Sequence, residues 1–349
     1  MIATSPLPET LVEKVGDDTL GILLGVAGVM VLLTINALFL VWLERKVSAW
    51  IQRRMGPTEV GPFGAFQTIA DMVKLLTKQL ITPRNVDKPL YHLAPLVVFV
   101  PVVAAASLFP FSESLVLNDL DIGLVLLFAF GGLGFIGIFM AGWGSNNKYA
   151  LLGAMRSVAQ NISYEIPLIL SALSVVLMAS TMDHGLVQNG QPVDINGLSL
   201  SHLAALQDDK GYWFVLVQPV AAVIYFIAAL AETNRAPFDI PEAESELVAG
   251  FHTEYSGMRF ALFFFAEYSN MFIVAMVATV LFLGGWSGPL LPGPVWFFLK
   301  VYALVALMMW VRWTFPRLRF DQLMSFCWAV LIPLSILNLI VTAFIARVV

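Results

Sequence analysis

Eight long apolar stretches constrain the fold of this chain more than any other feature of its sequence. Each is long enough to cross a bilayer as a helix. They cover residues 20–43, 93–112, 122–143, 156–181, 212–231, 259–284, 296–315 and 325–346. Since 59% of the 349 residues are hydrophobic and only 12% are charged, lipid must surround much of the protein surface. We therefore predict an all-α, polytopic integral membrane protein with about eight transmembrane helices in a single domain, residues 1–349.

The basic residues indicate how these spans are oriented. All but four of the 19 Lys and Arg follow the first, third, fifth or seventh span, and the four exceptions are Lys14, Lys210, Lys300 and Arg347. The positive-inside rule then predicts that both termini lie outside, which agrees with an even number of spans. Ala- and Val-rich spans favour a bacterial plasma membrane, and the mitochondrial inner membrane is the alternative.

The first inside loop contains a pattern typical of an amphipathic helix, at about residues 63–80. Its apolar residues recur in steps of three and four: Phe66, Ile69, Val73, Leu76 and Leu80. The opposite face carries Gln67, Asp71, Lys74 and Lys78. Such a helix either lies on the membrane surface or forms the wall of a cavity at the boundary between membrane and water.

Several cofactor classes are not expected in this chain. Cys327 is the single cysteine, so the chain cannot supply the four thiolates of an iron–sulfur cluster. The four histidines lack metal-ligand spacing, and no basic tract indicates nucleic acid. The pattern Gly132-Leu-Gly134-Phe-Ile-Gly137 matches a dinucleotide fingerprint, but it lies within an apolar span, where close helix packing explains it better. We therefore expect no metal, flavin, iron–sulfur cluster or nucleic acid bound by this chain.

Two glutamates are placed within apolar spans. Glu165 follows Arg156 by nine residues and Glu267 follows Arg259 by eight, which corresponds to about 13 Å and 12 Å along a helix. A charge at that depth costs at least about 3 kcal/mol, and such residues commonly mark an ion or proton path. The alternative is that each is neutral and hydrogen-bonded between helices. Pro167, just after Glu165, is expected to bend its helix.

The loop after the fifth span is unusually acidic for an inside loop. Its acids are Glu232, Asp239, Glu242, Glu244, Glu246 and Glu254. An ordinary solvated loop is one interpretation. Pro237, Pro241 and apolar residues such as Phe238 instead indicate an ordered segment folded into a cavity.

Three stretches make the chain recognisable. The first runs Glu44-Arg-Lys-Val-Ser-Ala-Trp-Ile-Gln-Arg-Arg-Met-Gly-Pro and continues through Val60-Gly-Pro-Phe-Gly and Ala70-Asp-Met-Val-Lys-Leu-Leu. The second runs Ala231-Glu-Thr-Asn-Arg-Ala-Pro-Phe-Asp and continues through Glu244-Ser-Glu-Leu-Val-Ala-Gly-Phe and Glu254-Tyr to Ala266-Glu-Tyr. The third is Arg156-Ser-Val-Ala-Gln-Asn-Ile-Ser-Tyr-Glu. Together they closely resemble the family of H-type membrane subunits, also called subunit 1, of respiratory complex I, the proton-pumping NADH:quinone oxidoreductase.

The resemblance implies a subunit without activity of its own, placed where the peripheral and membrane arms meet. Quinone, with ubiquinone as the expected form, would enter a chamber that this chain helps to form. Expected partners are the peripheral-arm iron–sulfur and quinone-site subunits, neighbouring small membrane subunits and membrane lipid. Quinone-chamber candidates are Glu44, Arg45, Gln52, Arg54, Phe63, Asp71, Lys74, Arg235 and Phe238. Proton-coupling candidates are Glu165, Glu232, Asp239, Glu242, Glu244, Glu246 and Glu267.

One departure from the family pattern is Met55, where some relatives carry a base. Three other functions stay open from the sequence. They are the related subunit of a membrane-bound hydrogenase or ferredoxin-linked enzyme, a self-contained secondary ion transporter, and a structural anchor for a peripheral arm. The transporter is disfavoured because no internal repeat is evident, and the anchor leaves the intramembrane acids unexplained.

Overall fold

Helices dominate the computed structural model, which describes residues 19–113, 115–182, 187–188, 191–192, 197–240 and 249–348. The helices are α2 (Thr19–Ile51), α3 (Gln67–Thr77), α4 (Lys88–Ala106), α5 (Gly123–Gly144), α6 (Lys148–Met182), α7 (Leu200–Lys210), α8 (Pro219–Glu232), α10 (Met258–Phe282), α11 (Gly293–Thr314), α12 (Phe320–Phe326) and α13 (Ile332–Val348). Short 3-10 turns lie at Pro62–Gly64, Phe214–Leu216 and Gly250–His252, and a π-helical turn, Cys327–Leu331, joins α12 to α13. Two small antiparallel pairs complete the described part: β1 (Pro110–Ser112) with β2 (Leu115–Val116), and β3 (Val187–Gln188) with β4 (Gln191–Pro192).

Seven helices in the described residues are long and apolar enough to cross a membrane: α2, α4, α5, α6, α10, α11 and the continuous α12–α13 helix. The prediction of an all-α polytopic membrane protein is confirmed. Helices are the natural result because lipid offers no partner for backbone N–H and C=O groups.

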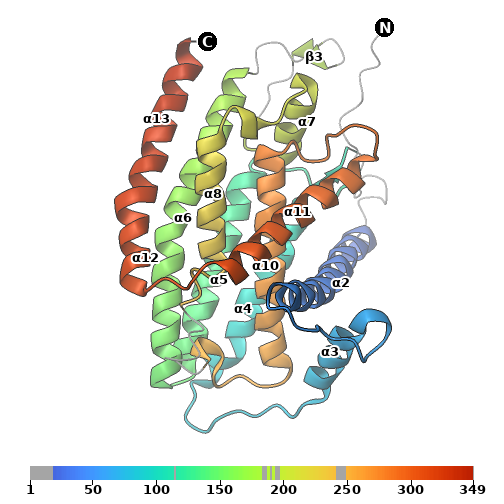
Figure 1. Ribbon diagram of the computed structural model, residues 1–349, viewed down its shortest axis with the longest axis vertical. Helices are drawn as coiled ribbons and strands as arrows, with labels where there is room; N and C mark the ends of the chain where they lie inside the picture. The colour runs from blue at the N-terminus through green and yellow to red at the C-terminus, as the bar shows by residue number, and fades with distance from the viewer. Residues whose placement is uncertain are drawn as a thin grey trace.

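The span expected at residues 212–231 is shorter than the sequence suggested. Phe214–Leu216 forms a separate 3-10 turn, and α8 begins only at Pro219, a residue suited to the first turn of a helix. In Figure 1, α8 ends well above the lower end of α6. The segment that follows α8 therefore starts within the bundle, between longer helices.

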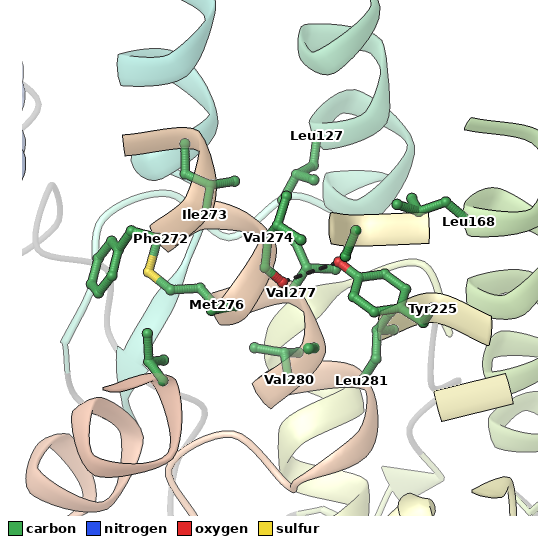
Figure 2. Packing of buried hydrophobic residues seen from close by; sticks show 14 of the residues in the cluster. Leu127, Leu168, Tyr225, Phe272, Ile273, Val274, Met276, Val277, Val280 and Leu281 are labelled. Carbon is green, nitrogen blue, oxygen red and sulfur yellow. Dashed lines mark hydrogen bonds between the residues drawn. The ribbon is translucent and has the colours of Figure 1, made fainter. Parts of the chain in front are cut away.

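Helices α6 and α10 form the centre of the bundle (Figure 1), and their most apolar stretches are the most buried of the seven. The second half of α10 is buried on all sides, as expected for a helix surrounded by protein. Figure 2 shows how Tyr225 of α8 packs there, with its hydroxyl donating a hydrogen bond to the Val274 carbonyl at 3.1 Å. Helices α2 and α11 are inclined to the others, and α13 lies at the outer edge.

The amphipathic helix expected at 63–80 is α3, which is confined to Gln67–Thr77. Before it, Phe63 sits at φ 53° in a 3-10 turn, and after it Lys78 is extended. Helix α3 packs against α2 and α10 while Ile69 and Val73 remain exposed. It therefore presents one apolar face outward and uses another to cover the two longer helices.

The glycine pattern of α5 explains how closely α4 approaches it. A β-carbon placed on Gly137 would lie 2.5 Å from a Val98 methyl and 2.9 Å from the Val98 backbone nitrogen. No real side chain fits at those distances. Close helix packing, the interpretation given to this pattern, therefore applies at Gly137.

Candidate functional site

A largely buried cluster of acidic and basic side chains joins four separate elements. Glu44 of α2 accepts a hydrogen bond from Arg235, in the segment after α8, at 2.8 Å, and it is also ion-paired with Arg312 of α11. Arg235 lies 3.3 Å from Glu267 of α10 and stacks over the Tyr268 ring at 4.4 Å. Glu44 is 6% and Arg235 3% exposed. We call Glu44, Arg235, Glu267 and Arg312 the ion-pair cluster.

The segment that carries Arg235 is held in place by Gln160 of α6. Its amide nitrogen donates hydrogen bonds of 2.8 Å to the carbonyls of Ala231 and Phe238, on both sides of Arg235. Burial alone would lower the pKa of Arg235, but the carboxylates of Glu44 and Glu267 more than offset this and raise it. The arginine therefore stays charged despite its burial, and it neutralises two acids at once.

Next to this cluster lies a large cavity between α2, α3 and α10, which we call the lateral cavity. Its volume is about 500 Å³, and most of its wall consists of apolar side chains such as Leu38, Met72 and Phe265. The polar exceptions include Arg45, Asp71, Lys74, Lys78 and Tyr268. Tyr268, which stacks on Arg235, therefore connects the lateral cavity with the ion-pair cluster.

Arg45 and Asp71 form the charged pair of the lateral cavity, with their side chains 2.6 Å apart. Gln67 donates a second hydrogen bond to Asp71 at 3.1 Å. Burial raises the pKa of Asp71, but these hydrogen bonds and the nearby cations Arg45 and Lys74 outweigh it, so that the pKa is lowered. Asp71 is thus an ionised, positioned carboxylate at neutral pH.

Five of the nine predicted chamber residues lie at the lateral cavity or the ion-pair cluster, and four lie elsewhere. Arg45, Asp71 and Lys74 line the lateral cavity, and Glu44 and Arg235 belong to the adjoining cluster. The others lie elsewhere: Phe238 is buried against the Tyr164 ring, Phe63 is 79% exposed, and Arg54 and Gln52 bond to one another on the surface.

The deeper acids Glu165 and Glu232 meet at neighbouring glycines of α5. A β-carbon on Gly131 would lie 3.3 Å from Oε1 of Glu232, and one on Gly132 would lie 3.8 Å from Oε1 of Glu165. Asp239 is paired with Arg317 at 2.9 Å. The remaining predicted acids, Glu242, Glu244 and Glu246, lie outside the described residues.

A backbone carbonyl close to Glu165 accepts a hydrogen bond from an unusual donor, a cysteine thiol. Pro167 has no N–H, so the carbonyl of Ser163 lacks its normal helical partner. The thiol of Cys327, in the π-helical turn, donates to that carbonyl at 3.1 Å. The cysteine thus has a structural role in stabilising α6 two residues from Glu165.

Arg312 belongs to the ion-pair cluster and Tyr268 stacks against its Arg235, although neither was predicted as a site residue. Arg312 lies in the last turn of α11, the end at which the predicted orientation already leads one to expect a cation. Tyr268 follows Glu267 directly in the sequence, but an aromatic residue in an apolar span is too common to indicate a site.

Residues 24–343 match the family model described as NADH dehydrogenase. The chain belongs to this family. The H subunit of the NADH-quinone oxidoreductase from Carboxydothermus hydrogenoformans is 48% identical over 331 residues, which cover 94% of this chain and 89% of that protein. The corresponding protein from Geobacillus kaustophilus is 50% identical, and the match covers 86% of this chain and 86% of that protein. The one from Dehalococcoides mccartyi (strain CBDB1) is 48% identical, and the match covers 89% of this chain and 82% of that protein.

The family assignment confirms the resemblance drawn from the three motif stretches. Glu44, Arg45, Asp71, Arg235 and Glu267 come from the first two of those stretches. In the structure of this NADH dehydrogenase family member, residues from both stretches meet at the ion-pair cluster, although they are far apart in the chain. Among the described residues, no three His, Cys, Asp or Glu side chains are grouped so as to hold a metal ion.

Proposed function

We propose that this chain is the membrane subunit of a proton-pumping NADH:quinone oxidoreductase that receives the quinone in the lateral cavity. The observation that carries the proposal is the cavity itself, about 500 Å³ with apolar walls and a charged pair at its edge. Its volume falls in the usual range of small-molecule sites, about 300–1,000 Å³. An apolar wall suits an isoprenoid tail, and the polar residues suit the oxygens of a quinone head.

The chain has no electron carrier of its own in this proposal. Two electrons reach the quinone from an iron–sulfur cluster in a partner subunit, and two protons are needed to complete the quinol. Arg45 and Lys74 are suited to stabilise the anionic forms that precede protonation. Glu267, Glu232 and Glu165 then respond by changing their protonation or position, and Asp239, Glu242, Glu244 and Glu246 are the further candidates from the sequence.

The proposed setting is a bacterial plasma membrane with both termini outside. The relatives named above are bacterial, and the mitochondrial inner membrane is the alternative setting. Partners are the peripheral-arm iron–sulfur and quinone-site subunits, neighbouring small membrane subunits and lipid. A reporter fused after Val349 checks the orientation: activity of an enzyme that folds only outside supports it, and activity of one that works only inside contradicts it.

Narrowing the lateral cavity tests the quinone assignment. Ala261 lines it, and Ala261→Phe is expected to raise the KM for quinone about tenfold in the assembled complex. Ile35→Phe, at an exposed position of α2 that does not line the cavity, serves as the control and should leave KM unchanged. Equal KM values for the two variants would refute quinone binding here.

The carboxylate part is tested separately with Glu165→Gln and Glu232→Gln. Each keeps the shape of the side chain but removes its ionisable proton. Quinone reduction and proton pumping are measured in complex whose assembly has been checked on a native gel. Wild-type rates of both reactions would remove that residue from the proposed pathway.

A further inference from the structure

The glycine pattern of α5 has two different kinds of neighbour. Gly137 is pressed against α4, as described above. Gly131 and Gly132 instead face the carboxylates of Glu232 and Glu165, and a β-carbon on Gly134 would meet no atom of the described residues within 4 Å. Packing against another helix therefore explains only one part of the pattern. The other part leaves open space inside the bundle.

That space is a second cavity, which we call the inner cavity. Its volume is about 90 Å³, and its wall includes Gly131, Gly134, Glu232 and Glu267. Among the described residues, it shares no lining residue with the lateral cavity. The two glutamates differ in their surroundings, because Glu267 is paired with Arg235 while Glu232 faces the glycines.

Asn161 of α6 also lines the inner cavity, and it is 1% exposed. Neither its amide nitrogen nor its carbonyl oxygen has a hydrogen-bond partner in the described part of the chain. A buried polar group left without a partner costs about 1–3 kcal/mol, so native proteins rarely tolerate two on one side chain. Both atoms are therefore expected to bond to something held in the cavity.

Water fits this position better than any other occupant. A site for one water needs about 10–15 Å³ of accessible volume together with two to four polar partners. The inner cavity offers more volume than that, and polar partners from Asn161, Asn234 and the two glutamates. A purely apolar cavity would be expected to stay dry.

We propose that Asn161 positions water molecules in the inner cavity and that this water carries protons between Glu267 and Glu232. The glycines of α5 keep the space that the water occupies. A proton leaves one carboxyl group for the adjacent water while another proton leaves that water for the opposite carboxylate, so no net charge remains on the water. Asn161 is a positioning residue here. The inference rests on the proposed function, since it supplies a link in its carboxylate pathway.

The test uses the complete complex, purified and reconstituted in liposomes. Asn161→Leu keeps the number and branching of the side-chain heavy atoms but has no polar atoms, and it is expected to lower turnover and coupled proton uptake about tenfold with an unchanged KM for quinone. Asn161→Thr restores a donor and an acceptor and should recover most of the rate. If Asn161 had a purely structural role, turnover would not fall with Leu and recover with Thr at an unchanged KM.

A second variant acts on the space rather than on the polar group. Gly134→Ala adds a methyl group where no atom lies within 4 Å, so it fits without a clash and displaces water. Turnover is expected to fall several-fold. Gly28→Ala on α2 is the matched control, since its β-carbon also meets nothing within 4 Å, and its position is exposed. If Asn161→Leu does not assemble, the Gly134→Ala result decides.

A density map of the wild-type complex that resolves ordered water completes the test. Water within hydrogen-bond distance of both amide atoms of Asn161 supports the inference, and an empty inner cavity overturns it. Wild-type turnover in Gly134→Ala and Asn161→Leu would also overturn it. If Glu165→Gln and Glu232→Gln lose turnover while the cavity is empty, only the water link fails and the proposed function stands.

Discussion

Removing the arginine at the centre of the ion-pair cluster should have a large effect on stability. Arg235 is 3% exposed and lies 2.8 Å from Glu44 and 3.3 Å from Glu267. The variant Arg235→Met keeps much of the length of the side chain but leaves carboxylates facing one another in a buried site. Breaking a buried ion pair on one side costs about 3–5 kcal/mol. Since Glu44 retains Arg312, we expect the lower value, about 3 kcal/mol.

The assay is the thermal unfolding midpoint of the purified complex, together with the amount that assembles. Arg317→Met is the matched control because it removes the same side chain from a pair with Asp239 in which the arginine is 40% exposed. That change should cost no more than about 1 kcal/mol. Adding Glu267→Gln to Arg235→Met should restore part of the loss, since one uncompensated carboxylate is removed. Equal losses for the two arginine variants would refute the reasoning.

Three further predictions concern other buried positions. Burial lowers the pKa of His252 from 6.5 to about 3 in the folded state. As the pH falls below 6.5, the histidine therefore gains a proton in the unfolded chain but not in the folded one. The folded state should lose about 2 kcal/mol of stability between pH 7.5 and 5 for this reason. His252→Phe should flatten that part of the stability–pH curve, and an unchanged slope would contradict the lowered pKa of His252. Gly137→Ala forces a methyl into Val98 and should prevent or strongly reduce assembly on a native gel, and normal assembly would contradict the packing described. Lys300→Met removes hydrogen bonds from the lysine ammonium to three carbonyls and should cost about 1.5–3 kcal/mol of thermal stability, whereas Lys210→Met at an exposed position should cost almost nothing.

The sequence was sufficient to predict the helical membrane architecture because the reason is local. A long apolar run must bond its own backbone groups when lipid surrounds it, and a helix does so within a few residues. The acids that stand out in the sequence are informative for the same reason, since an ionisable residue in an apolar run is costly wherever the helix lies. Motif resemblance then provided the family, which the matched family model confirms.

Only the tertiary structure decided which of these residues meet. Glu44 is 191 residues from Arg235 and 268 residues from Arg312, and no helical periodicity relates such distant positions. The same limit applies to Phe238, which is expected in the chamber by motif but packs against Tyr164. It also applies to α5, where one glycine pattern contacts a helix at Gly137 and leaves space at Gly134. Whether a small residue permits close packing or a cavity depends on the helix opposite, and that helix is placed by the packing of the whole bundle.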